Sequence, residues 1–159
     1  MELQVLHTPG HQHGGISLYD PENGALFSGD ALTPTITFDA WLGYVVDARS
    51  YWETLQTISR LNVEALLPAH ESIRLGGDAQ AEVERHVDRF KRVASEILSI
   101  LGSGDGLYLN EIADTVVHRV LFGRSDEATF TEVATVHSHL QKLIYDGKAR
   151  LEKGKYLIQ

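Results

Sequence analysis

Three histidines stand close together near the start of this 159-residue chain, in the sequence His7-Thr-Pro-Gly-His11-Gln-His13-Gly-Gly. An apolar run lies on each side of this segment, and loops held between rigid strands are where ligands and catalytic groups concentrate. The Pro-Gly pair before His11 predicts a tight turn that fixes the backbone direction there. The two glycines after His13 let the chain pass close to whatever His11 faces, so the loop has room for an ion.

Two further polar side chains follow apolar runs. Phe27-Ser-Gly leads to Asp30, and Leu66-Leu-Pro-Ala leads to His70. Because the chain has no cysteine, imidazole and carboxylate groups are the ligands left for zinc, iron or manganese. Singly, a loop histidine is usually a surface residue and an aspartate after a strand is usually a turn or cap residue. Together, His11, Asp30 and His70 predict a metal site.

The elements that must position these residues are short strands and one helix. Short apolar runs predict the strands, at residues 3–6, 16–19, 25–27 and 65–67. The turn sequence Asp-Pro-Glu-Asn-Gly at 20–24 predicts that 16–29 form a β-hairpin. Between the third and fourth runs, apolar residues three apart predict an amphipathic helix over 50–61. Ser50 is its expected N-cap, with Glu53 at the third helical position.

A second region begins after Gly76-Gly77. An apolar stripe with spacings of four and three predicts a long helix, and its members are Val83, Val87, Phe90, Ala94, Ile97 and Leu101. Packing in a core is the expected role of the stripe, and a helix-to-helix dimer contact is the alternative. An apolar segment at 109–117, a helix near 127–146 that stops at Gly147, and two strands in 149–158 around Gly154 follow. Helices followed by a hairpin suggest a winged-helix module, so we expect domains at 1–78 and 79–159.

Composition and charge exclude several classes of protein. With 43% hydrophobic and 23% charged residues, the chain is expected to fold around a core. No apolar run approaches the roughly 18 residues of a spanning helix, and Met-Glu-Leu-Gln lacks the features of a signal peptide. We therefore expect a cytoplasmic protein that does not bind a membrane. The net charge of -8, with 8 acidic and 7 basic residues in 105–159, argues against a nucleic-acid partner.

The three polar segments, in this order and spacing, resemble the metallo-β-lactamase superfamily of metal-dependent hydrolases, which includes hydroxyacylglutathione hydrolases. The matching sequences are His7-Thr-Pro-Gly-His11-x-x-Gly14, Phe27-Ser-Gly-Asp30 and Leu67-Pro-Ala-His70. The resemblance implies that His11 binds one metal ion, that His70 binds a second, and that Asp30 bridges both. Zinc is the expected metal, with iron or manganese as alternatives. Two such ions lower the pKa of a bridging water and polarise the scissile carbonyl or phosphoryl group.

The resemblance also covers residues of these motifs that are not expected to be metal ligands, or for which two roles are open. His7 belongs to the first motif but is not normally a ligand, so we expect it to support the turn or a neighbouring ligand. His13 is either a site contact or a solvated loop residue. Glu71 stands where the family commonly has glycine after its last histidine.

The chain also departs from this family. The diagnostic motif His-x-His-x-Asp-His lies well upstream of the Pro-Gly-His turn, and only six residues precede His7 here. The chain therefore offers two ligands to each ion, whereas a catalytic site normally takes at least three from the protein. The missing half carries one of the two sheets of the family's αββα sandwich, so we expect an exposed apolar face. We expect a C-terminal fragment, and the alternative is a second chain or a homodimer that completes the sheet.

The expected fold is α/β: the C-terminal half of a metallo-β-lactamase αββα sandwich followed by a winged-helix domain. The expected function is metal-dependent hydrolysis of a thioester or another small ester, incomplete in this chain alone. An endoribonuclease and a non-catalytic interaction module are the alternatives. Residues 128–146 contain Lys142 as their one base, which favours a packing or substrate-covering role for the second region. The aromatic residues Trp41, Tyr44, Tyr51 and Trp52 either line a substrate groove or pack in the protein.

Overall fold

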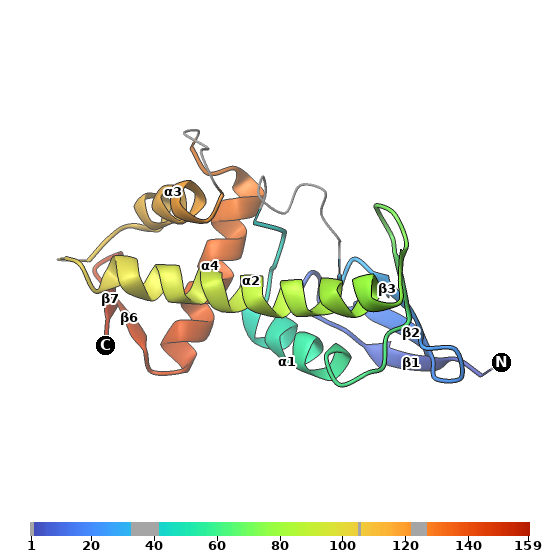
Figure 1. Cartoon of the computed structure of the whole chain (residues 1–159). Helices are drawn as coiled ribbons and strands as arrows, with labels where there is room; N and C mark the ends of the chain where they lie inside the picture. Colours follow the sequence, from blue (N-terminus) through green and yellow to red (C-terminus); the bar gives the residue numbers. More distant parts are fainter. Residues whose placement is uncertain (1, 33–41, 105, 122–126) are drawn as a thin grey trace. The chain divides into compact units, whose positions relative to one another are not determined.

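The computed structural model describes residues 2–32, 42–104, 106–121 and 127–159 (Figure 1). The chain divides into two compact units, one within 1–36 and 50–89 and the other within 37–49 and 90–159. The division at residue 89 lies inside a long helix, and the domain limits 1–78 and 79–159 stay a prediction. No helix in the described part of the chain is long and apolar enough to cross a membrane.

The first unit contains a five-stranded sheet with the order β1-β2-β3-β4-β5. The strands are β1 (Gln4–His7), β2 (Ile16–Asp20), β3 (Ala25–Gly29), β4 (Ala65–Pro68) and β5 (Arg74–Leu75). All four predicted strands and the β2–β3 hairpin are confirmed, each to within one or two residues. β1, β2 and β3 pair antiparallel, whereas β4 pairs parallel to β3. β5 was not predicted, because two residues are too short to show a period.

Helix α1 (Ala48–Ile58) makes the crossover that a parallel β3–β4 pair requires. The predicted limits of 50–61 and the predicted cap at Ser50 are wrong. Asp47 caps the helix instead, because its Oδ1 accepts a hydrogen bond from the backbone N–H of Arg49 at 3.0 Å. The end comes earlier because the backbone N–H of Leu61 bonds to the carbonyl of Ile58, three residues back, and so leaves the α-helical pattern.

The two faces of the sheet differ, because side chains alternate along each strand. One face carries the buried residues Tyr19, Leu26 and Leu66, and the unit's helices contribute Leu55, Ile58 and Val83 to the buried set. Figure 1 shows α1 and the start of α2 next to the first strands. The strand pairings place four exposed apolar residues on the other face: Val5 (67% exposed), Ile16 (57%), Phe27 (42%) and Leu75 (67%). The expected exposed apolar face is confirmed.

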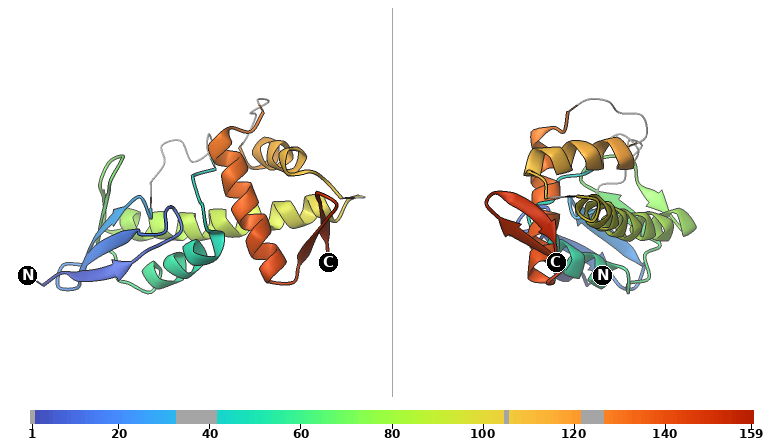
Figure 2. Two further views of the ribbon diagram at one scale, coloured as in Figure 1. Left: turned by 180° about the vertical axis from the view of Figure 1, so that it is seen from behind. Right: turned by 90° about the vertical axis from the view of Figure 1, so that its left-hand side faces the viewer.

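Helix α2 (Gly77–Leu101) runs from the first unit into the second, which continues with α3 (Leu109–Val120), α4 (Phe130–Tyr145) and the hairpin β6 (Ala149–Glu152) and β7 (Lys155–Ile158). Figure 2 shows α3, α4 and the hairpin from two further sides. The order of elements agrees with the prediction, and the identification as a winged helix stays a prediction. The hairpin turn has positive φ at Lys153 and Gly154, as a two-residue type I′ turn requires.

The limits of α4 follow from its caps. The helix begins at Phe130, three residues later than predicted, because the Glu132 carboxylate accepts hydrogen bonds from both the backbone N–H and the hydroxyl of Thr129. It ends before Gly147, whose φ of 70° is the left-handed conformation expected after a helix. The predicted stop at Gly147 is therefore confirmed.

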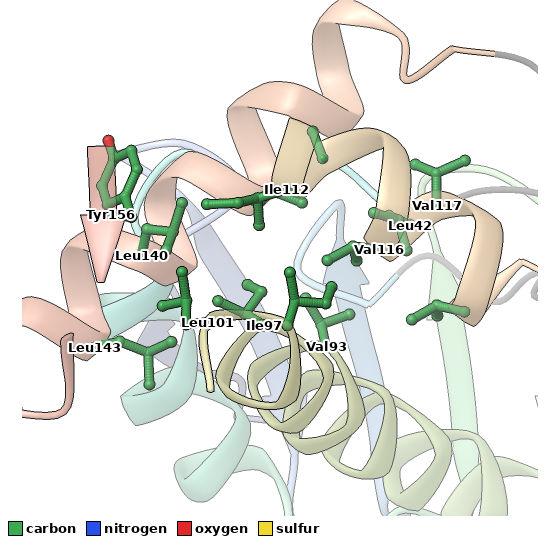
Figure 3. Packing of buried hydrophobic residues seen from close by; sticks show 14 of the residues in the cluster. Leu42, Val93, Ile97, Leu101, Ile112, Val116, Val117, Leu140, Leu143 and Tyr156 are labelled. Carbon is green, nitrogen blue, oxygen red and sulfur yellow. The ribbon is translucent and has the colours of Figure 1, made fainter. Parts of the chain in front are cut away.

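The core of the second unit joins α2, α3, α4 and β7 (Figure 3). Val93, Ile97 and Leu101 of α2 lie among its members. The other members that Figure 3 labels are Leu42, Ile112, Val116, Val117, Leu140, Leu143 and Tyr156. The core-packing interpretation of the long stripe is confirmed for this part of α2. Val93, which was not in the predicted stripe, belongs to the cluster, whereas Ala94 of the stripe is half-buried.

His139 is a buried titratable group in this unit. Its ring packs 4.6 Å from the ring of Phe90, and its Nδ1 donates to the backbone carbonyl of Thr135 at 2.9 Å. The other ring nitrogen, Nε2, is buried and has no hydrogen-bond partner among the residues that the structure describes. A proton on Nε2 would therefore be a desolvated charge. Burial lowers the pKa of His139 to about 4; the Thr135 carbonyl opposes this shift, and the charge of Lys142 adds to it.

Acidification is expected to destabilise the protein through His139. Because its pKa is about 4 in the folded state and 6.5 as the ordinary value, the unfolded chain takes up the proton first as the pH falls. The free energy of unfolding should decrease between pH 6.5 and 4, by up to about 3 kcal/mol from this residue. Urea unfolding at several pH values should give a shallower pH dependence for His139→Asn. A slope equal to that of the unaltered chain would contradict this, and exposed His137→Asn is the matched control.

Candidate functional site

The predicted site residues follow strands that end at one edge of the sheet. β1 and β3 run in the same direction, because each is antiparallel to β2, and β4 is parallel to β3. The carboxyl ends of these three strands therefore lie at the same edge. His11 lies in the loop after β1, Asp30 directly after β3, and His70 just after β4. Ligand sites in sheets with parallel strands are commonly found at this edge.

The structure brings both histidines to Asp30. The Nε2 atom of His11 lies 3.9 Å from Oδ2 of Asp30, and the Nε2 atom of His70 lies 3.3 Å from Oδ1 of the same carboxylate. Each carboxylate oxygen thus faces a different imidazole. The side chains of His11 and Asp30 are 27% and 33% exposed, whereas that of His70 is 72% exposed. The His70 side of the cluster is therefore the side open to solvent.

Backbone hydrogen bonds connect the segments that carry Asp30 and His70. The N–H of Ala69 donates to the carbonyl of Gly29 at 3.2 Å, which joins the residue before His70 to the residue before Asp30. The N–H of Ala31 donates to the carbonyl of Ser28 at 3.1 Å and closes a turn around Asp30. The relative position of these two side chains therefore depends on the pairing of β3 with β4.

The loop that carries His11 is closed by its own hydrogen bonds. The N–H of Thr8 donates to the carbonyl of Gly15 at 2.8 Å. His7 supports the same loop, because its Nε2 donates to the backbone carbonyl of His13 at 3.3 Å. The side chain of His13 itself is exposed. This contact gives His7 the supporting role expected of it, through the backbone of the loop.

A line of buried hydroxyl groups connects this loop to the Asp30 turn. The hydroxyls of Thr8 and Ser17 lie 2.9 Å apart, and that of Ser17 donates to the carbonyl of Ser28 at 3.1 Å. Since the single proton of Ser17 is used in this way, Thr8 is the donor to Ser17. All three residues are buried. None of the three was predicted from the sequence. The available signal was that Ser17 and Ser28 alternate in phase with the buried residues of their strands.

Glu71 follows His70 in the left-handed backbone conformation, with φ at 72°. A side chain in this conformation costs about 1 kcal/mol relative to the right-handed region. Glycine has no such cost, which gives a physical reason for the glycine that the resemblance implies after the last histidine. At position 71 the backbone therefore has a conformation typical of glycine, although the residue is glutamate.

The ligand types at this edge fit a metal ion, but their number is small. Imidazole and carboxylate are ligands of zinc, iron and manganese. Within the described ranges, no group of three or more histidine, aspartate or glutamate side chains is arranged so that it could hold a metal ion. The cluster instead consists of two pairs that share Asp30.

Of the aromatic residues considered for a groove, Tyr51 has surroundings that the structure describes. Trp41 lies outside the described residues, and the groove itself stays a prediction. Tyr51 packs against the backbone of Gly10. Burial raises the pKa of the Tyr51 phenol, and the charge of Arg89 acts against this shift. Tyr51 therefore keeps its proton at neutral pH and is a hydrogen-bond donor.

Sequence comparison relates the first part of the chain to known proteins. The pattern of the Metallo-beta-lactamase superfamily matches residues 2–70. Acyl-coenzyme A thioesterase MBLAC2 of Gallus gallus is 40% identical over 72 residues, which cover 43% of this chain and 26% of that protein. The same thioesterase of Homo sapiens is 39% identical over 72 residues, covering 43% of this chain and 25% of that protein.

Structure comparison covers almost the whole chain. A metallo-beta-lactamase family protein of Thermus thermophilus has a TM-score of 0.75 at 22% identity, over 99% of this chain and 49% of that chain. A beta-lactamase domain protein of Burkholderia ambifaria has a TM-score of 0.75 at 18% identity, over 98% of this chain and 47% of that chain. At these identities the likeness concerns the fold.

The chain spans about half the length of these solved structures and about a quarter of the length of the thioesterases. The matched segment, 2–70, contains His11, Asp30 and His70, the residues that the structure brings together at one edge of the sheet. Through this segment, the chain matches the metallo-beta-lactamase superfamily.

Proposed function

We propose that this chain supplies part of the active site of a metal-dependent hydrolase that acts on thioesters or other small esters. The observation that carries the proposal is the arrangement of Asp30, whose two carboxylate oxygens each face one imidazole, of His11 and of His70. Identity of 40% with an acyl-coenzyme A thioesterase over the same part of the chain supports a thioester as the substrate.

The distances in the cluster support metal binding by these residues. Two donor atoms on one tetrahedral zinc ion, each about 2.0–2.1 Å from the metal, lie about 3.4 Å apart. The Nε2–Oδ1 distance of 3.3 Å between His70 and Asp30 agrees with this value, and the Nε2–Oδ2 distance of 3.9 Å between His11 and Asp30 is longer than it. In the proposal His11 and Asp30 hold one ion, His70 and Asp30 hold the other, and the negative charge of Asp30 is shared by both.

Zinc ions, with iron or manganese as alternatives, would supply a hydrolytic nucleophile near neutral pH and polarise the carbonyl of the ester. The chain's own residues orient the site: Asp30 sets the separation of the two imidazoles, and exposed His70 leaves one side open for a small substrate. Two ligands for each ion are fewer than the three of a usual catalytic site. Further ligands must therefore come from outside the described residues.

The exposed apolar face of the sheet supports a partner as the source of those ligands. Val5, Ile16, Phe27 and Leu75 are each more than 40% exposed on one face. Apolar residues gathered in this way mark an interaction surface in a folded protein. In the proposal a second sheet covers this face, contributed by further polypeptide or by a second chain, a second copy included.

The second unit is proposed to be a winged-helix module with a packing or substrate-covering role. Much of the surface of its helix α4 is buried. The buried residues include Thr135, Val136, His139, Leu140 and Leu143. Lys142 is the one lysine or arginine in α4, and its Nζ forms an ion pair with Oδ2 of Asp146 at 2.6 Å. A nucleic-acid-reading helix commonly presents several basic side chains, so the alternative of an endoribonuclease is not favoured.

Metal content tests the proposal. The full chain, purified without a chelator, is expected to carry about one or more metal ions per molecule, as measured by plasma mass spectrometry. Hydrolysis of an acyl-coenzyme A substrate, measured as release of the free thiol, is expected only where further polypeptide completes the ligand set. Metal content far below one ion per chain, unchanged by added zinc, would overturn the proposal and favour a non-catalytic interaction module.

A further inference from the structure

Helix α1 makes a hydrogen bond to each of the two segments that carry His11 and Asp30. The hydroxyl of Thr54 donates to the backbone carbonyl of Pro9 at 2.7 Å. The hydroxyl of Tyr51, one turn earlier, donates to the backbone carbonyl of Ala31 at 3.1 Å. Pro9 precedes His11 by two residues, and Ala31 directly follows Asp30. One turn of one helix therefore touches both segments next to their functional side chains.

The helix and the His11 loop are also in direct backbone contact. A Cβ atom placed on Gly10 would lie 2.3 Å from Cβ and 2.4 Å from Cα of Tyr51. Such distances are far below van der Waals contact, so only glycine allows this approach. Gly10 is buried, and so is Thr54. The loop therefore cannot shift along the helix without a change in the contacts of both residues.

These contacts have a geometric consequence. His11 and Asp30 lie 19 positions apart in the chain, on different loops, and the 3.9 Å between Nε2 of His11 and Oδ2 of Asp30 is longer than a hydrogen bond. Tyr51 and Thr54, spaced three apart on α1, lie on the same side of the helix and each hold one of the two loops. The helix thereby sets the distance between the loops.

We propose that Tyr51 and Thr54 are positioning residues that set the separation of His11 and Asp30 through the backbone of their loops. The relevance of this separation to metal binding rests on the proposed function, whereas the separation itself does not. Residues that orient metal ligands in this indirect way typically change metal affinity by 10–100-fold when they are removed.

Each variant for the test differs from the unaltered chain in one side chain. Tyr51→Phe removes only the phenol oxygen, and Thr54→Val replaces the hydroxyl by a methyl group. Thr54→Ser keeps the hydroxyl and is the conservative rescue. Thr57→Val is the matched control on the same helix, because the exposed Thr57 hydroxyl donates to the carbonyl of Glu53 within the helix.

Two readouts are compared on the full chain. The first needs no metal: the NMR cross-peak, through space, between the ring protons of His11 and the β-protons of Asp30. We expect this cross-peak in the unaltered chain, Thr54→Ser and Thr57→Val, and its loss or marked weakening in Tyr51→Phe and Thr54→Val. The second is the zinc dissociation constant by calorimetry, which should rise about 10–100-fold in the same two variants.

The outcomes separate this inference from the proposed function. Cross-peaks of unchanged intensity in Tyr51→Phe and Thr54→Val would overturn the positioning role, as would a missing cross-peak in the unaltered chain. If Thr54→Val fails to fold, Tyr51→Phe decides, because it keeps the packed ring. If the unaltered chain binds no zinc, the proposed function fails, while the metal-free cross-peaks still decide whether the two hydroxyls position the loops.

Discussion

Replacing Asp30 with alanine is expected to remove both metal ions from the site at once, whereas His11→Ala should remove only one. The reason is that Asp30 is the group shared by the two pairs, with Oδ2 toward His11 and Oδ1 toward His70. A carboxylate that bridges two ions also supplies the negative charge that both need. Plasma mass spectrometry of the purified full-length variants measures the bound metal directly.

His13→Ala is the matched control for this experiment. His13 lies two residues after His11 in the same loop, its side chain is exposed, and its backbone carbonyl, which accepts from His7, is kept in the variant. We expect metal content equal to that of the unaltered chain. Equal metal loss from Asp30→Ala and His11→Ala would contradict the bridging role of Asp30.

Gly10→Ala is expected to disrupt both the stability of the first unit and the site. Gly10 has φ at 130°, a conformation that costs another residue of order 1–3 kcal/mol. The added Cβ would also overlap the backbone of Tyr51, so the loop and α1 must move apart. Urea unfolding should show a loss of at least about 2 kcal/mol, since the dihedral cost and the overlap add. Zinc affinity should fall as well.

Gly14→Ala separates this effect from a general sensitivity of the loop. Gly14 lies four residues further on, and a Cβ atom there would meet nothing within 4 Å. We expect the stability and the zinc affinity of Gly14→Ala to match those of the unaltered chain. The close approach of the loop to α1 would be disproved if the two variants behaved alike.

Much of the fold was predictable from local patterns. The hairpin of β2 and β3 was predicted because Pro21, Asn23 and Gly24 dictate turn dihedrals within a few residues. The stop of α4 was predicted from Gly147 for the same local reason. The ends of α1 were not, since Ser50 and Asp47 are both good caps and the choice between them depends on where the preceding chain is held.

The order and spacing of His11, Asp30 and His70 were sufficient to single them out and to place each after a strand. Their mutual distances were not, because they follow from the parallel pairing of β3 with β4, which joins residues about 40 positions apart. Sequence periodicity describes one element at a time and carries no information on such pairings.

The sequence by itself predicted which side chains could bind a metal ion and where most of the strands and helices lie, and the family resemblance added the expectation of an uncovered apolar sheet face. The tertiary structure alone decided that Asp30 faces both histidines and that Tyr51 and Thr54 hold the two loops. The physical reason is the separation along the chain of the residues that interact. Turns, caps and amphipathic patterns depend on neighbours in the chain, whereas hydrogen bonds to carbonyls such as those of Pro9 and Ala31 depend on where distant segments meet.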